Sequence, residues 1–137
     1  GNPIIGVMTK VSAFRRASSR FSIDIGGIRG KKAVAFSGIG NPDSFARTLN
    51  SVGLDVKANV VFPDHHVYRE SELRNVKNLL VQTGADYCVT TEKDAARLSS
   101  PKSEYRSFLE ETPLFFVEIE QTIIAGETEL NQGIGKL

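Results

Sequence analysis

The sequence is poor in the residues that build cross-linked, metal-bound or membrane-spanning proteins. Its one cysteine, Cys88, excludes an internal disulfide framework and a zinc site made of several cysteines, and it fits a reducing compartment. Its two histidines, His65 and His66, are adjacent, so metal binding by them with Asp64 is poorly supported, because no further histidine is available. No apolar stretch approaches the roughly 20 residues that a helix needs to cross a bilayer. We therefore expect a soluble chain without a bound metal.

Motifs of the common phosphate-binding loops are also missing. No G-x-x-x-x-G-K-[ST] segment occurs, which excludes a P-loop. Gly38 and Gly40 would begin a dinucleotide-binding G-x-G-x-x-G motif, but Asp43 stands at the third glycine position. The segment 38–42 is therefore either a tight turn or a loop that a ligand can approach closely. A small nucleotide-binding domain that uses these two glycines is one alternative, and it predicts binding of ATP or NAD.

Charge is balanced over the chain but not along it. The 137 residues include 17 Lys and Arg against 16 Asp and Glu, so nothing indicates a globally basic nucleic-acid binder. Residues 1–32 nevertheless hold seven basic residues against Asp24 alone, a net charge of +6. This basic arm is either a solvated hairpin or a surface that meets anionic lipid headgroups or a phosphate-bearing substrate.

Length and hydrophobic pattern predict one α/β domain. A chain of 137 residues with 40% hydrophobic residues suffices for a single compact core. From Ala33 onward, short continuous apolar runs alternate with helical patterns, which is typical of a mostly parallel sheet flanked by helices. The predicted strands are 33–36, 56–62, 86–89 and 113–117, and the predicted helices follow Asn41, Ser71 and Thr91 as N-caps.

The N-terminal part follows a different pattern. Residues 4–11 and 21–25 are predicted to be two strands that frame a polar loop at 12–20. We accordingly divide the chain into a basic ribbon or linker, 1–30, and an α/β domain, 31–137. Because the chain starts with Gly1 rather than methionine, we expect it to be a piece of a longer protein.

Three polar clusters follow predicted strands, at the sheet edge where ligands bind in open parallel sheets. The first is the glycine-containing segment 38–42. The second contains Asp64 and His65, and a carboxylate beside a histidine fixes its tautomer and favours the imidazolium, which suits proton transfer or charge stabilisation. The third is 90–94, where Lys93 and the threonine hydroxyls either bind phosphate or belong to a helix cap. The alternative for the second cluster is an ordinary polar loop.

These clusters carry a family resemblance when they are taken together. The segments Ala-Phe-Ser-Gly-Ile-Gly-Asn-Pro (35–42), Val-Phe-Pro-Asp-His-His-Val-Tyr (61–68) and Val-Thr-Thr-Glu-Lys-Asp-Ala-Ala-Arg-Leu (89–98) occur in this order. They resemble the C-terminal half of tetraacyldisaccharide 4′-kinase, the lipid A 4′-kinase family. The similarity spans about residues 31–117, and the ribbon before it resembles the linker between the two halves of the family.

The resemblance implies the C-terminal lobe of a two-lobed, ATP- and Mg²⁺-dependent P-loop kinase. The family acts at the cytoplasmic face of the bacterial inner membrane, where it phosphorylates the 4′-hydroxyl of tetraacyldisaccharide 1-phosphate in lipid A biosynthesis. Asp64 and His65 match the Asp-His pair of the family. The histidine of that pair is implicated in the catalytic cleft, where it assists an aspartate of the other half, so the resemblance implies this role for His65 with Asp64 as its neighbour. The next position, His66, varies in the family.

The ATP-binding half of the family is missing from this sequence. Phosphoryl transfer depends on charge neutralisation by the P-loop and Mg²⁺, so we expect the isolated chain to be inactive and to bind neither ATP nor Mg²⁺ tightly. The expected partners are the lipid substrate, the missing P-loop lobe and an anionic membrane surface, without nucleic acid. The alternative is a non-catalytic module that binds an anionic glycolipid or another partner. Both interpretations place the ring of His65 in an open groove at the end of a strand.

Overall fold

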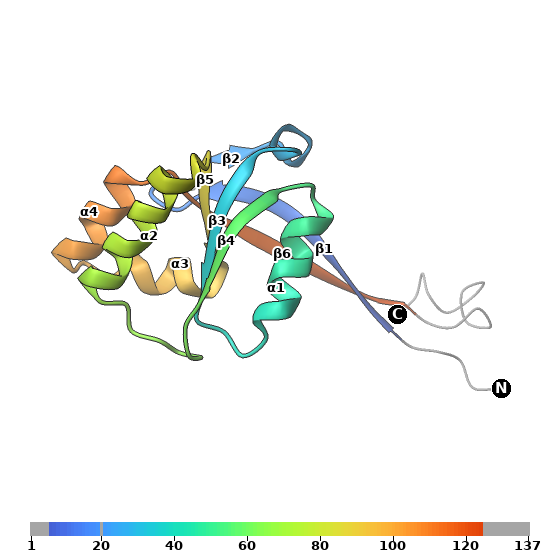
Figure 1. Ribbon diagram of the computed structural model, residues 1–137. Helices are drawn as coiled ribbons and strands as arrows, with labels where there is room; N and C mark the ends of the chain where they lie inside the picture. Colours follow the sequence, from blue (N-terminus) through green and yellow to red (C-terminus); the bar gives the residue numbers. More distant parts are fainter. Residues whose placement is uncertain (1–5, 20, 125–137) are drawn as a thin grey trace.

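The fold is a six-stranded sheet with helices on both faces (Figure 1). The computed structural model describes residues 6–19 and 21–124. The strand order is β2-β1-β6-β5-β3-β4; β3–β4, β3–β5 and β5–β6 are parallel pairs, and β1 runs antiparallel to β2 and β6. The strands are β1 (Gly6–Arg16), β2 (Ser22–Ile23), β3 (Lys32–Ser37), β4 (Asp55–Val61), β5 (Tyr87–Thr91) and β6 (Leu114–Ile124). This confirms the predicted mostly parallel α/β sheet with antiparallel strands at its N-terminal side.

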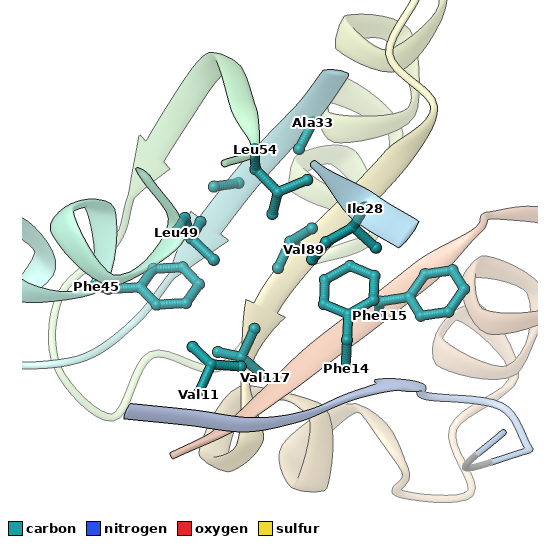
Figure 2. Packing of buried hydrophobic residues seen from close by; sticks show 11 residues of the cluster. Val11, Phe14, Ile28, Ala33, Phe45, Leu49, Leu54, Val89, Phe115 and Val117 are labelled. Atoms are coloured by element: carbon teal, nitrogen blue, oxygen red, sulfur yellow. The ribbon is translucent and has the colours of Figure 1, made fainter. Parts of the chain in front are cut away.

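Helices cover the two faces of the sheet. Within the described residues they are η1 (Ile25–Ile28), α1 (Pro42–Ser51), α2 (Glu70–Thr83), α3 (Glu92–Leu98) and α4 (Ser103–Glu111). Side chains of β3 alternate between two buried clusters: Ala33 and Ala35 pack with α1, whereas Val34 and Phe36 pack with α2 and α4. Figure 1 shows α1 on one side of the sheet and α2 with α4 on the other, and Figure 2 shows the α1 cluster.

The helix boundaries follow the capping residues in most cases. Asn41 caps α1 as predicted, because its side-chain oxygen accepts a hydrogen bond from the backbone N–H of Ser44 at 3.1 Å. Gly84 ends α2 with a φ of 67°, the left-handed conformation that favours glycine. The predicted cap Ser71 is wrong: the N-cap is Arg69, two residues earlier, and α2 begins at Glu70. The Arg69 N–H donates to the Glu72 carboxylate at 2.8 Å.

The predicted polar loop at 12–20 is wrong over its first half, because β1 continues to Arg16. Pairing with β6 explains this, since it runs from Gly6 opposite Ile124 to Arg16 opposite Phe115. Val11 and Phe14 are three residues apart, so in a regular strand their side chains would lie on opposite faces. A bulge between Val11 and Ala13 instead places both in the same core cluster. Ser12, which lies between them, is exposed, and its hydroxyl donates a hydrogen bond to the Glu118 carbonyl of β6 at 3.2 Å.

The C-terminal part of the fold also contains more regular secondary structure than the sequence predicts. β6 extends past Val117 to Ile124, and β1 and β6 run together beyond the other strands (Figure 1). Helix α4 was not predicted, and it buries Tyr105 and Phe108. The division of the chain at residue 30 stays a prediction, although the sheet itself combines strands from both sides of that position.

Two basic residues of the segment 1–32 have partners on β6. Arg15 pairs with Glu118 at 2.9 Å, and Arg16 lies over the Phe115 ring, 5.9 Å from its centre. The exposed basic residues of this segment include Lys10, Arg29, Lys31 and Lys32. None of the helices in residues 6–19 and 21–124 combines the length and apolar character that crossing a bilayer requires.

Candidate functional site

A buried carboxylate lies at the carboxyl edge of the sheet. Asp94, in the first turn of α3, is fully buried. Its oxygens accept hydrogen bonds from the Gly38 N–H at 3.2 Å, the Tyr68 hydroxyl at 2.8 Å, the Thr91 hydroxyl at 2.5 Å and Arg97 Nη1 at 2.8 Å. An ionised carboxylate without partners would be strongly destabilised in such a place, so these donors are what keep Asp94 inside.

The donors around Asp94 keep their protons. Burial, together with the negative charge of Asp94, raises the pKa of Tyr68 well above its ordinary value, so the hydroxyl remains a donor. The guanidinium of Arg97 is permanently charged and forms an ion pair with the carboxylate. Thr91 has two roles, because its oxygen also accepts from the Asp94 N–H at 3.1 Å, which confirms the predicted cap of α3.

Asp94 joins the three sequence motifs at one point. Gly38 follows β3, Tyr68 belongs to the segment between β4 and α2, and Asp94 itself begins α3. A Cβ added at Gly38 would lie 3.1 Å from His66 Cβ and 3.1 Å from the Pro63 carbonyl oxygen. The glycine therefore permits close approach by the neighbouring protein segments themselves.

His65 lies at the surface beside this network. Its side chain is 81% exposed, its Nε2 is 3.7 Å from Asp64 Oδ2, and its Nδ1 is 3.3 Å from Arg97 Nη2. Its backbone N–H donates to the Gly38 carbonyl at 3.2 Å. The φ of 60° puts a non-glycine residue in the left-handed region, a conformation that costs about 1 kcal/mol or more and is concentrated at functional sites. Asp64 and His65 thus lie next to each other, exposed, at the end of β4.

His66 points the other way. Its ring stacks on Phe62 at 4.7 Å, and its Nε2 is 2.8 Å from Glu72 Oε1 on α2. Burial alone would raise the pKa of Glu72, but the hydrogen bonds from His66 and from the Arg69 N–H together lower it. His66 therefore fixes the loop to α2, and the two neighbouring histidines have different surroundings.

A hollow of about 550 Å³ adjoins the site, between α1, the start of α3 and β6. Gly40 lines it, and a Cβ there would lie 3.5 Å from Asp64 Oδ2, so the hollow and the Asp64–His65 pair share one edge of the molecule. Its other lining residues are Ile39, Asn41, Ser44, Phe45, Thr48, Thr91, Glu92, Lys93, Val117 and Ile119.

The phosphate site considered for residues 90–94 is wrong in part. The Thr90 hydroxyl is buried and donates to the Phe36 carbonyl at 2.8 Å, and that of Thr91 donates to Asp94. Both hydroxyls are therefore used inside the fold, and Lys93 is exposed at the hollow next to the carboxylate of Glu92 in sequence. Cys88 is fully buried as predicted, and burial raises the pKa of its thiol well above the ordinary value.

Sequence reasoning missed Arg97 and the central place of Asp94. Arg97 Nη1 donates to the Gly38 carbonyl at 3.0 Å as well as to Asp94, and Nη2 reaches His65. The spacing of Asp94 and Arg97, three residues apart on a helix, was the available signal for a pair on one helix face. The capping pattern of Thr91 already accounted for Asp94, so nothing indicated its burial.

Within the described residues, the side chains do not form a site for Mg²⁺. In the part of the chain that the structure describes, His, Cys, Asp and Glu side chains do not gather in groups of three or more that would hold a metal ion. The sequence also has no P-loop motif. No residue of this chain is therefore assigned to the nucleotide or to a metal.

Comparisons with known proteins identify relatives. The profile of the family described as "Tetraacyldisaccharide-1-P 4'-kinase" matches residues 6–136. A tetraacyldisaccharide 4'-kinase of Halothermothrix orenii is 34% identical over 109 residues, which are 80% of this chain and 28% of that protein. The enzyme of the same name from Methylorubrum extorquens strain PA1 is 40% identical over 103 residues, 75% of this chain and 28% of that protein.

A solved structure has the same fold. The crystal structure of LpxK from Aquifex aeolicus, described as an "apo" form in complex with ATP, matches 96% of this chain and 35% of its own, with a TM-score of 0.53 and 19% identity. The chain thus spans little more than a quarter of the length of the two curated relatives described above. With its profile match over most of its length, the chain belongs to the tetraacyldisaccharide-1-phosphate 4′-kinase family.

Proposed function

We propose that the chain is the C-terminal lobe of an ATP-dependent kinase that phosphorylates the 4′-hydroxyl of tetraacyldisaccharide 1-phosphate in lipid A biosynthesis. The main structural support is the exposed Asp64–His65 pair at the carboxyl edge of the sheet. His65 is held there by its left-handed backbone, by its N–H bond to the Gly38 carbonyl and by the contact with Arg97. Family membership supports the activity, and the names of the relatives support the substrate.

His65 presents its ring to the substrate cleft in this proposal. The exposed Nε2 lies on the side of Asp64, and Nδ1 lies on the side of Arg97. From there the imidazole assists a carboxylate of the partner lobe that activates the sugar hydroxyl, and Asp64 supports the ring as its neighbour. The hollow beside Gly40 gives the substrate space along the same edge.

ATP with Mg²⁺ supplies the phosphoryl group and neutralises the charge that develops during its transfer. We assign both to the P-loop lobe of the complete protein, because this chain has no P-loop sequence. The isolated chain is accordingly proposed to be inactive. The complete protein is placed at the cytoplasmic face of the bacterial inner membrane, where its lipid substrate is found.

The test is His65→Ala in the complete kinase. We expect kcat to fall by about a hundredfold or more, the usual contribution of a proton-transferring side chain, with the melting temperature nearly unchanged because the ring is exposed. Arg74→Ala, an exposed change on α2 away from the site, is the matched control and should keep full activity. An unchanged kcat for His65→Ala would refute the proposed role.

A second candidate function is binding of an anionic glycolipid or a partner without chemistry. A hollow of about 440 Å³ favours it, because Lys10 and Arg29 line this hollow together with Val11, Ile25 and Val52. Cations beside apolar side chains match a phosphorylated headgroup with its acyl chains. Sedimentation with vesicles of anionic and of neutral lipid separates the outcomes, since this function requires association with the anionic vesicles that weakens with added salt.

A further inference from the structure

Arg97 is the residue that connects the buried network to His65. Its side chain is one-quarter exposed, and the guanidinium makes three directed contacts: Nη1 donates to Asp94 Oδ1 at 2.8 Å and to the Gly38 carbonyl at 3.0 Å, and Nη2 lies 3.3 Å from His65 Nδ1. Asp94 is fully buried and held by three further donors, so it is a fixed anchor. A planar group held at two points leaves the direction of its third contact little freedom.

The chemistry of this third contact is determined by the guanidinium. Arginine carries only N–H donors and no acceptor, so Nδ1 of His65 has to be the accepting nitrogen. A neutral imidazole that accepts at Nδ1 carries its proton at Nε2. Nε2 is the nitrogen on the side of Asp64, at 3.7 Å from Oδ2. The contact with Arg97 therefore selects one tautomer of His65, with an N–H available for a carboxylate.

His65 has little else to fix its ring. Its side chain is 81% exposed, and the left-handed φ of 60° and the N–H bond to the Gly38 carbonyl fix its backbone only. The Gly38 carbonyl oxygen accepts hydrogen bonds from both the His65 N–H and Arg97. The backbone of His65 and the guanidinium of Arg97 are therefore held to the same atom. Without Arg97, rotation about the side-chain bonds and exchange between tautomers would be limited by solvent contacts and by Asp64 alone.

We propose that Arg97 is a positioning residue, anchored on Asp94, that holds the His65 ring in the tautomer with its proton on Nε2 and directs this N–H toward the cleft. The proposal deepens the proposed function and rests on it for its catalytic consequence. The tautomer of His65, however, is a property of this chain that is measurable without activity.

The first experiment uses ring ¹⁵N NMR of the 137-residue chain. His65 and His66 are the only histidines in the sequence, so comparison with the His65→Ala variant assigns every ring signal. In the unmodified chain at a pH where the ring is neutral, we expect His65 Nδ1 to show the signal of an accepting nitrogen and Nε2 that of a protonated one. The same spectrum taken on Arg97→Lys should show a mixture of tautomers for His65, with the His66 signals unchanged.

Lysine is the informative replacement at position 97. An ammonium group can keep the ion pair with Asp94, so the fold is retained, but it lacks the planar fork that contacts the carboxylate and the imidazole together. Urea unfolding of both chains checks that the fold is retained. If Arg97→Lys does not fold, the same spectrum is taken on Arg97→Gln. The glutamine amide keeps a donor toward Asp94 but lacks the planar guanidinium that contacts Asp94 and His65 together. A His65 ring that has the same tautomer in the unmodified chain and in the folded position-97 variant would overturn the proposal.

The second experiment measures kinetics of the complete kinase. We expect Arg97→Lys to lower kcat about ten- to a hundredfold with little change in KM, as a misoriented catalytic group does. Combined with His65→Ala, it should add no further loss, because both changes remove the same oriented N–H. Full additivity of the two losses, or a full kcat in Arg97→Lys alongside a reduced kcat in His65→Ala, would contradict the positioning role. If His65→Ala keeps full activity, the proposed function fails, whereas the NMR result still decides the tautomer.

Discussion

A single carboxylate holds the carboxyl edge of this sheet together. Asp94 receives hydrogen bonds from Gly38 directly after β3, from Tyr68 in the loop after β4 and from Arg97 of its own helix, so it connects segments up to 56 residues apart in sequence. These contacts bring the three short motifs together in the fold. Each motif supplies a donor, or the acceptor itself, to one buried ionic network.

The Asp94 network leads to a stability prediction. Asp94→Ala leaves the Gly38 N–H and the Tyr68 hydroxyl without their acceptor and removes the ion-pair partner of Arg97, so we expect the free energy of unfolding to fall by about 3–5 kcal/mol. Tyr68→Phe removes only one donor and should cost less, about 1.5–3 kcal/mol. Urea unfolding followed by circular dichroism measures both. Equal stability of Tyr68→Phe and the unmodified chain would show that this network does not stabilise the fold.

At the scale of elements, the loop between β4 and α2 has two halves with different tasks. His65 is exposed, whereas His66 stacks on Phe62 and pairs with Glu72 at the start of α2. Glu72 also accepts from the Arg69 N–H, which closes the first turn of the helix. The inner half of the loop is therefore tied to α2, and this attachment holds the exposed half, with Asp64 and His65, in place.

This attachment predicts a pH dependence. The hydrogen bonds from His66 and Arg69 outweigh the effect of burial and lower the pKa of Glu72 in the folded chain. Stabilisation by Glu72 is therefore complete above the ordinary glutamate pKa of about 4.3 and is lost as the pH falls through the lower folded value. We expect the stability advantage of the unmodified chain over Glu72→Gln to be constant near pH 6 and to shrink toward pH 3 in urea titrations. A stability advantage that does not change over this range would exclude the stabilising role of the ionised Glu72 carboxylate.

The elements differ in how well their sequence predicts them. The buried strands and the caps Asn41 and Thr91 follow local patterns, and the structure has them as predicted. The second half of β1 and the end of β6 do not, because each is stabilised by pairing with the start of the other strand, across more than 90 residues of sequence. In the site, the adjacency of Asp64 and His65 is local and visible, whereas the contact of Arg97 with His65 depends on how α3 packs beside the β4–α2 loop.

At the scale of the whole molecule, the described residues of the segment 1–30, which are 6–19 and 21–30, are built into the sheet and its core. Val11, Phe14 and Ile28 are buried in the cluster that α1 covers (Figure 2), and Phe14 stacks on Phe115 of β6 at 4.8 Å. A segment that served only as a linker would not bury side chains of this size. The long antiparallel pair of β1 and β6 instead makes the N-terminal segment one edge of the sheet.

A chain that begins at residue 31 tests this role. Removal of residues 1–30 deletes the buried side chains of Val11, Ala13, Phe14 and Ile28 and exposes the paired edge of β6. Phe14→Ala alone should cost about 3–5 kcal/mol. Since whole domains are stable by only about 5–15 kcal/mol, we expect the shortened chain to be unfolded or aggregated in size-exclusion chromatography and circular dichroism. Lys10→Ser removes charge from the same segment but no buried group, and should shift stability by about 0.5 kcal/mol or less. A shortened chain that unfolds cooperatively at the original urea midpoint would instead establish residues 31–137 as an independent domain.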